Sequence, residues 1–376
     1  MPGEPVVPSY CAPGVAAVLP TLLGAGDPSW LPAPVSGARS VVVLVIDGLG
    51  WDALHDRRGE LPALGALEGM RVTSVAPSTT ASALTSITTG VAPSEHGLVG
   101  FRMRVEGDVL NALSWQVNGR RPPDPTLVQR HAPFRGRTVP VVTKSEFHRS
   151  GFTEAHLRGA RFCGWRAVSS LVEHCRRLVG DGEPLVYAYY PGVDEVAHAH
   201  GLHDGFYEAE LRFADRLVEM LRAALPEHAA LLVTADHGQV HLERDAWVEL
   251  GDLVDLVDAC AGDGRFRYLY ARRGAAGELL DAARATHGER AWVLSRDELV
   301  DAGWLGPPPA APVRRRVGDV ILAAATDVAF VDPTFPREVA LRSGHGSLTS
   351  PEMWVPLVAG RGTGTGRTAA GRERLG

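Results

Sequence analysis

The sequence feature that most constrains the fold is the stretch VVVLVIDGLG, which runs from Val41 to Gly50. Its uninterrupted series of β-branched and aliphatic residues is typical of a strand buried on both faces, as in a parallel sheet covered by helices. The series stops at Asp47. Open α/β sheets bind ligands beyond the carboxyl ends of their strands, and a buried carboxylate without a partner is costly. We therefore interpret Asp47 as the first ligand of a metal site.

Strand-like and helix-like patterns alternate along the rest of the chain. Further strands are expected at 71–75, 139–143, 185–190, 229–234, 320–325 and 355–359, and helices at 81–89, 165–179 and 206–225. Such alternation predicts an α/β fold in which a mostly parallel sheet carries helices on both faces.

We expect one domain over residues 1–376, with two small peripheral insertions. Residues 100–142 consist of short alternating pieces between Gly- and Pro-rich turns, and we interpret them as a cap-like excursion over the site. Residues 244–315 are less regular and form the second excursion. The Gly-, Thr- and Arg-rich tail after Gly360 is expected to be frayed.

Composition excludes several classes of protein. A net charge of −6 without a basic patch argues against a nucleic-acid duplex as partner. The four cysteines lack CxxC spacing, which argues against a disulfide framework or a cysteine-rich zinc site. No stretch approaches the roughly 20 uninterrupted apolar residues of a membrane span, and the N-terminus lacks the basic residues of a signal peptide. We therefore expect a cytoplasmic protein with no membrane partner; the sequence carries no signal for its oligomeric state.

Two of the expected strands are followed by further metal-binding types of side chain. Asp194 and His198 come after strand 185–190, and a spacing of four places both on one face if that turn is helical. Asp236 and His237 come after strand 229–234. Neighbours point apart in a regular strand, so these two converge only on a turn past its end, or else bind from different sides.

A glycine-flanked histidine, His345, completes a set of three Asp and three His. That number of ligands suits two zinc-like ions with open coordination positions. Each residue alone has an ordinary alternative: Asp47 as a helix cap, His198 on a helix surface, His345 in a turn. The ordered recurrence of all of them favours the metal site.

A hydroxyl nucleophile is the second requirement of such a site. Thr80 lies at the start of the expected helix 81–89, where free N–H groups and the helix dipole favour a phosphate. A threonine hydroxyl is a poor nucleophile until a bound divalent ion lowers its pKa. Ser78 and Thr79 compete for this role, and one of the three is expected to cap the helix instead.

The ordered motifs IDG, DxxxH, ADHG and GHG resemble the alkaline phosphatase superfamily, and within it the type I phosphodiesterase/nucleotide pyrophosphatase family. The resemblance implies an alkaline-phosphatase-like fold and two divalent ions, zinc in preference to Mn or Mg. In that family's pattern one ion would take Asp47, Thr80, Asp236 and His237, and the other Asp194, His198 and His345. Counting back from Thr89-Gly90, the pattern places the nucleophile at Thr80 rather than Thr79.

The chain also departs from that family. Ala81 and Ala83 stand where nucleotide-cleaving members often place an aromatic residue and an Asn that contacts the phosphate. Tyr189 matches a position that lines the nucleotide pocket, with core packing as its alternative. No Cys-x-Pro-x-Arg sequence is present, which excludes the sulfatase branch.

The resemblance implies a metal-dependent hydrolase of the phosphodiesterase/nucleotide pyrophosphatase type, which acts on a small phosphorylated substrate. Thr80 would attack in line and form a phosphothreonine intermediate. The alternatives are a phosphomonoesterase, a phosphonoacetate-type hydrolase that cleaves a C–P bond at the same site, and a catalytically idle metal-binding homologue. A mutase of the same superfamily would need a larger second domain than residues 100–142 provide.

Overall fold

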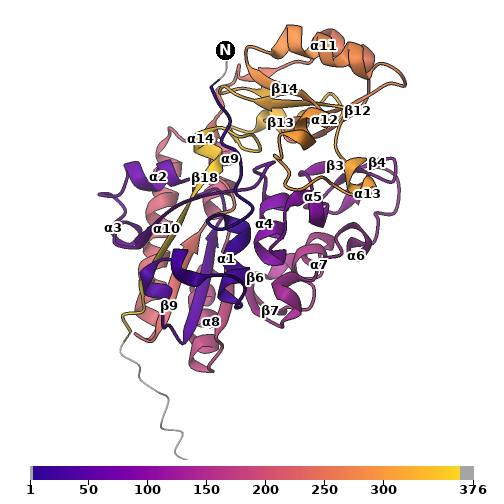
Figure 1. Ribbon diagram of the computed structural model, residues 1–376. Coiled ribbons are helices and arrows are strands. Elements are labelled where there is room, and N and C mark those ends of the chain that lie inside the picture. The colour runs from indigo at the N-terminus through magenta and orange to yellow at the C-terminus, as the bar shows by residue number, and fades with distance from the viewer. Residues whose placement is uncertain (1–2, 365–376) are drawn as a thin grey trace, which may run out of the picture.

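A seven-stranded sheet forms the centre of the computed structural model, which describes residues 3–364 (Figure 1). Its strand order is β2-β18-β9-β1-β8-β6-β7, and only β18 runs antiparallel to its neighbours. The predicted, mostly parallel sheet is thereby confirmed. The strands are β1 (Ser40–Ile46), β2 (Glu68–Thr73), β6 (Pro140–Lys144), β7 (Arg161–Trp165), β8 (Leu185–Tyr190), β9 (Ala229–Thr234) and β18 (Trp354–Arg361).

Strand β1, which corresponds to the apolar stretch before Asp47, lies in the middle of this sheet. Every one of its residues is buried, as the uninterrupted apolar run predicts. It pairs in parallel with β8 on one side and β9 on the other. Because the three strands run side by side in the same direction, the segments that follow them meet at one edge of the sheet.

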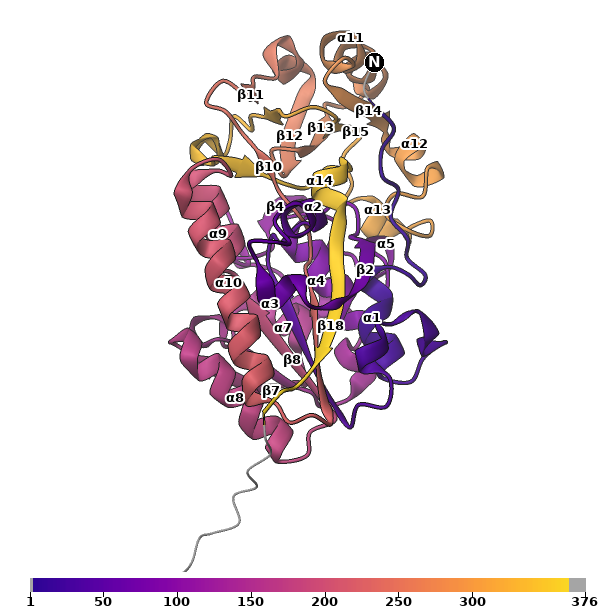
Figure 2. The same cartoon turned by 90° about the vertical axis from the view of Figure 1, so that its left-hand side faces the viewer.

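Helices cover both faces of the sheet, as predicted. Figure 2 shows β18 along its length between the two layers, with α8 and α10 on one side and α1 on the other. One layer consists of α8 (Val168–Gly180) and α10 (Gly205–Ala224). The other consists of α1 (Val15–Leu22), α4 (Thr80–Thr89) and α7 (Gly151–Leu157). The predicted helices 81–89, 165–179 and 206–225 correspond to α4, α8 and α10.

The region predicted as a cap-like excursion forms a small antiparallel sheet. Its strands are β3 (Arg102–Val105), β4 (Asp108–Asn111) and β5 (Gln116–Val117), followed by α6 (Pro125–Val128). Leu113, at the turn between β4 and β5, reaches two of the cavities described below.

The second excursion is more regular than its sequence indicates. Together with β15, which follows it in the chain, it forms a four-stranded antiparallel sheet in the order β12-β13-β15-β14. The expected late strand 320–325 pairs in this second sheet rather than in the central one. Arg265 and Arg267 break the apolar pattern at β13, yet both are fully buried because they pair with Glu352 and Glu338. The elements are β12 (Val257–Gly262), β13 (Phe266–Ala271), α11 (Ala276–His287), β14 (Ala291–Ser295), α12 (Arg296–Asp301), α13 (Ala311–Arg314) and β15 (Val320–Ala324).

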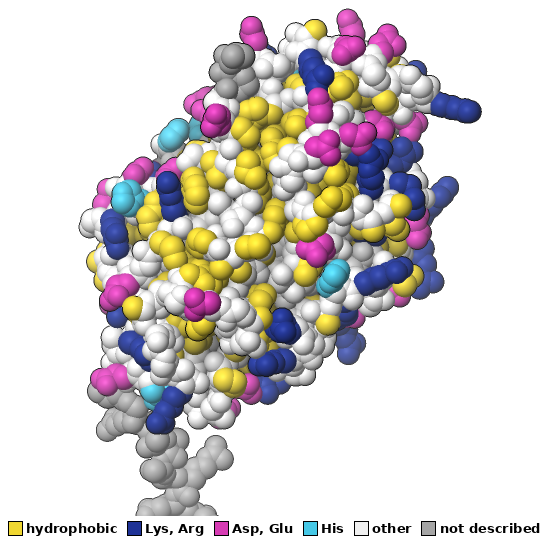
Figure 3. Space-filling view, viewed as in Figure 1, with side chains coloured by type: hydrophobic (Ala, Val, Ile, Leu, Met, Phe, Trp, Pro, Cys, Tyr) yellow, Lys and Arg dark blue, Asp and Glu magenta, His cyan; other side chains and the backbone are white. Residues whose placement is uncertain are grey.

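Short elements complete the described chain. They are α2 (Trp51–Asp56), α3 (Pro62–Gly65), α5 (Pro93–His96), α9 (Gly192–His200), α14 (Ser350–Met353), β10 (Val240–His241), β11 (Trp247–Val248), β16 (Ala329–Phe330) and β17 (Ser343–Gly344). Most of the tail that was expected to be frayed, from residue 365 onward, lies outside the described residues. Within residues 3–364, no helix combines the length and apolar character that a membrane crossing requires. Figure 3 shows Lys and Arg side chains gathered on the side of the molecule where Figure 1 places β4 and α13.

Candidate metal centre and active site

The predicted ligands converge at the carboxyl edge of the central strands. Asp47 directly follows β1, and Asp236 and His237 follow β9 on a turn past the strand end. Asp194 and His198 lie on α9, the helix that follows β8, so the helical turn expected there is present. The six side chains form two groups, in each of which the ligand atoms lie within 4.8 Å of one another: Asp47, Asp236 and His237 form the buried group, and Asp194, His198 and His345 form the open group.

The buried group is organised around the ring of His237. Its Nε2 lies 3.3 Å from Asp47 Oδ1, 3.5 Å from Asp236 Oδ2 and 3.1 Å from Thr80 Oγ1. Its Nδ1 lies 3.1 Å from the Gly238 carbonyl, which can only accept a hydrogen bond. Nδ1 therefore carries the proton, and the lone pair of Nε2 faces the carboxylates as a metal ligand requires.

Two buried carboxylate oxygens in this group have no partner. Asp47 Oδ1 and Asp236 Oδ2 are buried without a hydrogen bond among the described residues. Burial raises the pKa of Asp47 well above its usual value, and the charges of Asp236 and Asp194 raise it further. Burial likewise raises the pKa of Asp236. Unpaired oxygens beside an imidazole nitrogen are the donor set of a divalent cation, so these residues fit such an ion.

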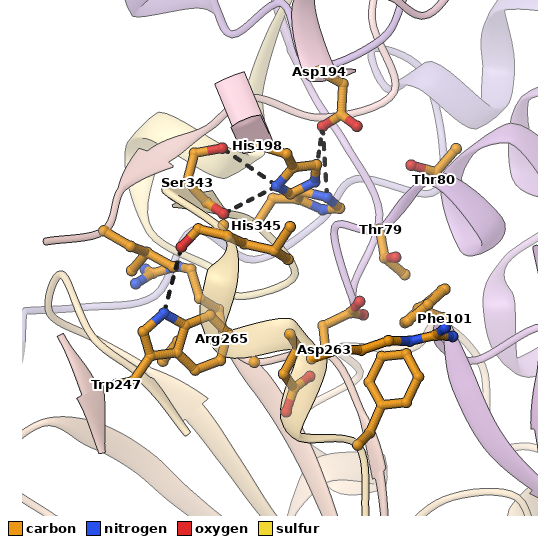
Figure 4. Close-up of a pocket in the computed structure, with 18 of the residues that line it drawn as sticks. Thr79, Thr80, Phe101, Asp194, His198, Trp247, Asp263, Arg265, Ser343 and His345 are labelled. Carbon is orange, nitrogen blue, oxygen red and sulfur yellow. Dashed lines mark hydrogen bonds and ion pairs between the residues drawn. The ribbon is translucent and has the colours of Figure 1, made fainter. Parts of the chain in front are cut away.

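The open group centres on one carboxylate oxygen of Asp194. His198 Nε2 lies 3.3 Å and His345 Nε2 3.7 Å from Asp194 Oδ1 (Figure 4). The Nδ1 atoms of the two histidines donate to backbone carbonyls, that of Ser343 at 3.0 Å and that of Ser78 at 2.9 Å. Both Nε2 lone pairs therefore point at the carboxylate. Burial and the neighbouring histidines lower the pKa of His345 well below its usual value, which keeps it neutral.

The two groups touch through a stacked pair of rings. The centroids of His237 and His345 lie 3.6 Å apart, with 10° between the ring planes.

Two further side chains donate hydrogen bonds to the carboxylates and so orient them. The Tyr189 hydroxyl donates to Asp47 Oδ2, and the Gln239 amide donates to Asp194 Oδ1. The sequence gives no pattern that singles out Gln239, because a residue two positions after the Asp236-His237 pair can point in any direction.

Of the three candidate nucleophiles, only Thr80 approaches the buried group. The Ser78 hydroxyl is buried, donates to the Ser347 carbonyl at 2.7 Å and accepts from the Gly346 N–H at 3.1 Å, so it fastens two loops together. Thr79 occupies the N-cap position of α4, but its side chain makes no capping hydrogen bond. The expected side-chain cap is therefore wrong. Thr79 instead lines a cavity beside Asp263 (Figure 4).

Two cavities meet at Thr80. One has a volume of about 400 Å³ and extends past the open group toward the second sheet. The other has a volume of about 260 Å³ and a largely apolar wall. Thr80, Leu113 and Asp194 line both. We call the first the open-side cavity and the second the apolar cavity; the Thr80 hydroxyl has room on either side.

Tyr189 lines the apolar cavity together with Phe147, whose ring centroid lies 6.3 Å from its own. Tyr189 thus lies in the expected pocket and also donates a hydrogen bond to Asp47, a candidate metal ligand.

Asp263 lines the open-side cavity and comes from the second excursion, and the sequence analysis does not predict it. Burial raises its pKa to about 7. Ala81 and Ala83, which stand where the family pattern often places an aromatic residue and an Asn, are fully buried.

Comparison with known proteins gives a family and a fold. The model of the family "Type I phosphodiesterase / nucleotide pyrophosphatase" matches residues 41–347. Murine ectonucleotide pyrophosphatase/phosphodiesterase 5 superposes with a TM-score of 0.66 at 16% identity, over 85% of this chain and 87% of that one. An inactive variant of it in complex with AMP gives a TM-score of 0.65 at 16% identity, with the same coverage.

A bacterial enzyme has the same fold. Phosphonoacetate hydrolase from Sinorhizobium meliloti 1021, in complex with phosphonoformate, superposes with a TM-score of 0.60 at 20% identity, over 86% of this chain and 91% of that one. A search of curated proteins found no match. The predicted α/β architecture is that of both neighbours.

Proposed function

The chain belongs to the type I phosphodiesterase/nucleotide pyrophosphatase family, and from that premise we propose that it cleaves a small phosphorylated substrate with Thr80 as the nucleophile. It is a hydrolase of phosphate-ester or phosphoanhydride bonds, as its family is. The observation that carries the proposal is the position of Thr80. Its hydroxyl oxygen lies 3.1 Å from His237 Nε2, at the first turn of α4 and at the junction of two cavities.

Two divalent ions, zinc in preference to Mn or Mg, would be held by the buried and the open groups. The orphaned oxygens of Asp47 and Asp236 and the inward-facing Nε2 atoms support this assignment. When bound, such ions would supply Lewis-acid stabilisation of the phosphate charge and favour the deprotonated hydroxyl.

The proposed reaction is an in-line displacement. A phosphate at the start of α4 faces the free N–H groups of the first turn, which stabilise its negative charge. The Thr80 oxygen forms a bond to phosphorus while the bond to the leaving group breaks on the opposite side. Water then attacks the resulting phosphothreonine and restores Thr80.

The two cavities favour a diester or a pyrophosphate over a monoester. A diester carries one group on each side of phosphorus, and the site offers one space on each side of Thr80. The apolar cavity, with the rings of Tyr189 and Phe147, suits a flat or apolar group. A monoester would leave one of the two spaces without a substrate group.

Two alternatives use the same residues. A phosphonate would place its carboxyl-bearing arm in the open-side cavity, and the complex of phosphonoacetate hydrolase with phosphonoformate gives this alternative its support. A catalytically idle homologue would keep both ligand groups without turnover. We also propose a cytoplasmic location, since the four cysteines are free thiols.

Replacement of Thr80 tests the nucleophile. Thr80→Ala should lower hydrolysis of bis-p-nitrophenyl phosphate by about 10³-fold or more, because no neighbouring hydroxyl takes its position. Zinc content should stay that of the wild type. Thr88→Ala, a matched replacement on the same helix whose hydroxyl bonds only the backbone carbonyls of Leu84 and Thr85, should retain turnover. Activity of more than a few per cent in Thr80→Ala would refute the assignment.

A substrate panel separates the alternatives. The proposal expects higher kcat/KM for bis- than for mono-p-nitrophenyl phosphate, and little release of phosphate from phosphonoacetate. The reverse order would favour one of the two other hydrolases. A protein that contains both ions but cleaves none of the three substrates would be the idle homologue.

A further inference from the structure

A third cavity, remote from Thr80, is lined by an unusual number of arginines. It has a volume of about 620 Å³ and lies between the β3–β4 hairpin, the end of α6 and the second sheet. It shares no lining residue with the open-side or apolar cavities. Its arginines are Arg104, Arg130, Arg296, Arg315 and Arg316. We call it the arginine cavity.

Arg316 forms the buried floor of this cavity. The residue is only 8% exposed and has no carboxylate partner among residues 3–364. Its Nη1 donates to the Gly97 carbonyl at 2.7 Å and to the Val128 carbonyl at 2.9 Å. Its Nε and Nη2 atoms have no acceptor in the described part of the chain. These two atoms are not among the buried atoms that lack a partner, so they face the cavity and are available to an anion from outside.

The backbone around Arg316 is shaped to admit the guanidinium. Gly97 has a φ of +84°, and a Cβ atom built there would lie 2.3 Å from Arg316 Nη1. Only glycine satisfies both requirements. Burial and the charge of Arg130 lower the pKa of Arg316 to about 10, so the side chain still carries its charge at neutral pH.

Two of the other arginines are already neutralised. Arg104 pairs with Asp258 at 2.8 Å, and Arg296 pairs with Asp319 at 2.7 Å. These pairs form part of the wall and leave little charge for a ligand.

Arg130 and Arg315 differ from those pairs. Both are exposed at the mouth of the cavity, and neither has an ion-pair partner within the described residues. With Arg316 they place three unpaired guanidiniums around the cavity, against one unpaired lining carboxylate, Glu106. The sequence predicts no basic patch, and for this face of the molecule that prediction is wrong. The three arginines come from segments that only the fold brings together.

We propose that the arginine cavity binds a small phosphate-bearing polyanion at a site separate from the reacting centre. Guanidinium groups bind phosphate oxygens in a planar, two-pronged geometry, and burial strengthens such bonds. Three cations within one cavity call for a compact ligand with two or more negative charges. Phosphate and pyrophosphate groups have that charge density, whereas a single carboxylate does not.

Calorimetric titration of inorganic pyrophosphate into the metal-free, full-length protein tests the site. Removal of metal takes away the cations of the reacting centre, and the variants below lie outside that centre, so a loss of binding in them does not depend on the proposed hydrolytic function. We expect one pyrophosphate per chain. The double variant Arg130→Gln/Arg315→Gln should weaken binding by about tenfold or more, because it removes two charge-assisted contacts.

A matched control separates the site from general charge. Arg137→Gln/Arg273→Gln also removes two exposed arginines and two positive charges, but neither residue lines the cavity. It should change the affinity by less than about twofold, since distant charges are screened. Arg316→Met, if a thermal melt shows that it is folded, should abolish binding; if it does not fold, the mouth variant decides.

Three outcomes would overturn the proposal. The first is no binding of pyrophosphate by the metal-free wild type. The second is an equal loss of affinity in the control and mouth variants, which would indicate only non-specific attraction. The third is binding of citrate as tight as that of pyrophosphate, which would show that the cavity does not select phosphate.

Discussion

The buried and open groups have similar side chains in different surroundings. Asp236 and His237 are fully buried and Asp47 is 2% exposed, whereas the side chains of Asp194 and His198 are 15% and 21% exposed. The buried group stands at the ends of two central strands of the sheet. The open group lies on a surface helix and a loop. Position in the fold, rather than residue type, therefore distinguishes the two.

Charge differs between the groups as well. The buried group has two carboxylates and one imidazole, and the open group has one carboxylate and two imidazoles. Two carboxylates neutralise a divalent cation, whereas one leaves a net positive charge that would attract an anionic substrate. We infer that the buried group holds its ion more tightly and that the open group is the first to meet the substrate.

The sharpest test of this comparison replaces one ligand in each group. Asp236→Asn should lower kcat/KM by about 10³-fold or more, and His198→Ala by a smaller factor, because the buried group also orients Thr80. Elemental analysis should show the loss of one ion in each variant. His200→Ala, on the same helix but outside both groups, is the control and should keep both ions. Equal losses in the two ligand variants would contradict the inferred difference.

The side chains behind the ligands allow a finer test. Tyr189→Phe removes the hydroxyl that donates to Asp47, and Gln239→Leu removes the amide that donates to Asp194. Each should reduce the metal affinity of its own group by about 10–100-fold, the usual effect of such orienting partners. Tyr190→Phe is a matched control, since its hydroxyl bonds Glu210 instead.

Competition with a chelating dye measures these affinities. The titration must resolve two metal-binding steps, one for each group of ligands, so that each variant can be assigned to its own step. If both variants weaken the same step, the two groups act as a single site and the comparison fails.

Removal of the ions with a chelator should also proceed in two stages. The ion of the open group has a solvent-facing path and one fewer carboxylate, so we expect it to leave about tenfold faster or more. Stopped-flow mixing with a chelator, followed by elemental analysis of quenched samples, measures both rates. Release of the two ions at a single rate would argue against a difference in access.

The sequence predicts most of the site because its ligands follow strands with strong apolar patterns. The central strands β1, β8 and β9 are fully buried, so their ends and the polar residues beyond them are unambiguous. The second sheet is harder to predict, since Arg267 lies in β13 and is stabilised by Glu338 and the Phe330 carbonyl, which lie far away in the sequence. Gln239 and Asp263 could not be foreseen for the same reason, because their partners come from other segments.

The smallest expected effect is a pH dependence of stability in the metal-free protein. Burial raises the pKa of Asp47 and Asp236, so the folded chain binds more protons than the unfolded chain above pH 4 or so. Stability should therefore fall as the pH rises through the raised values, by about 1–2 kcal/mol. The lowered pKa of His345 acts in the opposite direction, but only below its unfolded value of 6.5.

Burial raises the pKa of Asp263 to about 7, so its ionisation also lowers the stability of the folded protein as the pH rises. Urea unfolding above pH 6.5, compared between the wild type and Asp236→Asn, therefore separates the buried group from Asp263. There the metal-free wild type should lose stability with pH, and Asp236→Asn should show a flatter slope, because the substitution removes one of the two carboxyls that titrate. Zinc should reverse the slope, since bound ions compete with protons for the same oxygens. A metal-free protein that gains stability in this range would mean that the two carboxylates are already ionised without an ion, and that burial alone does not separate the two groups.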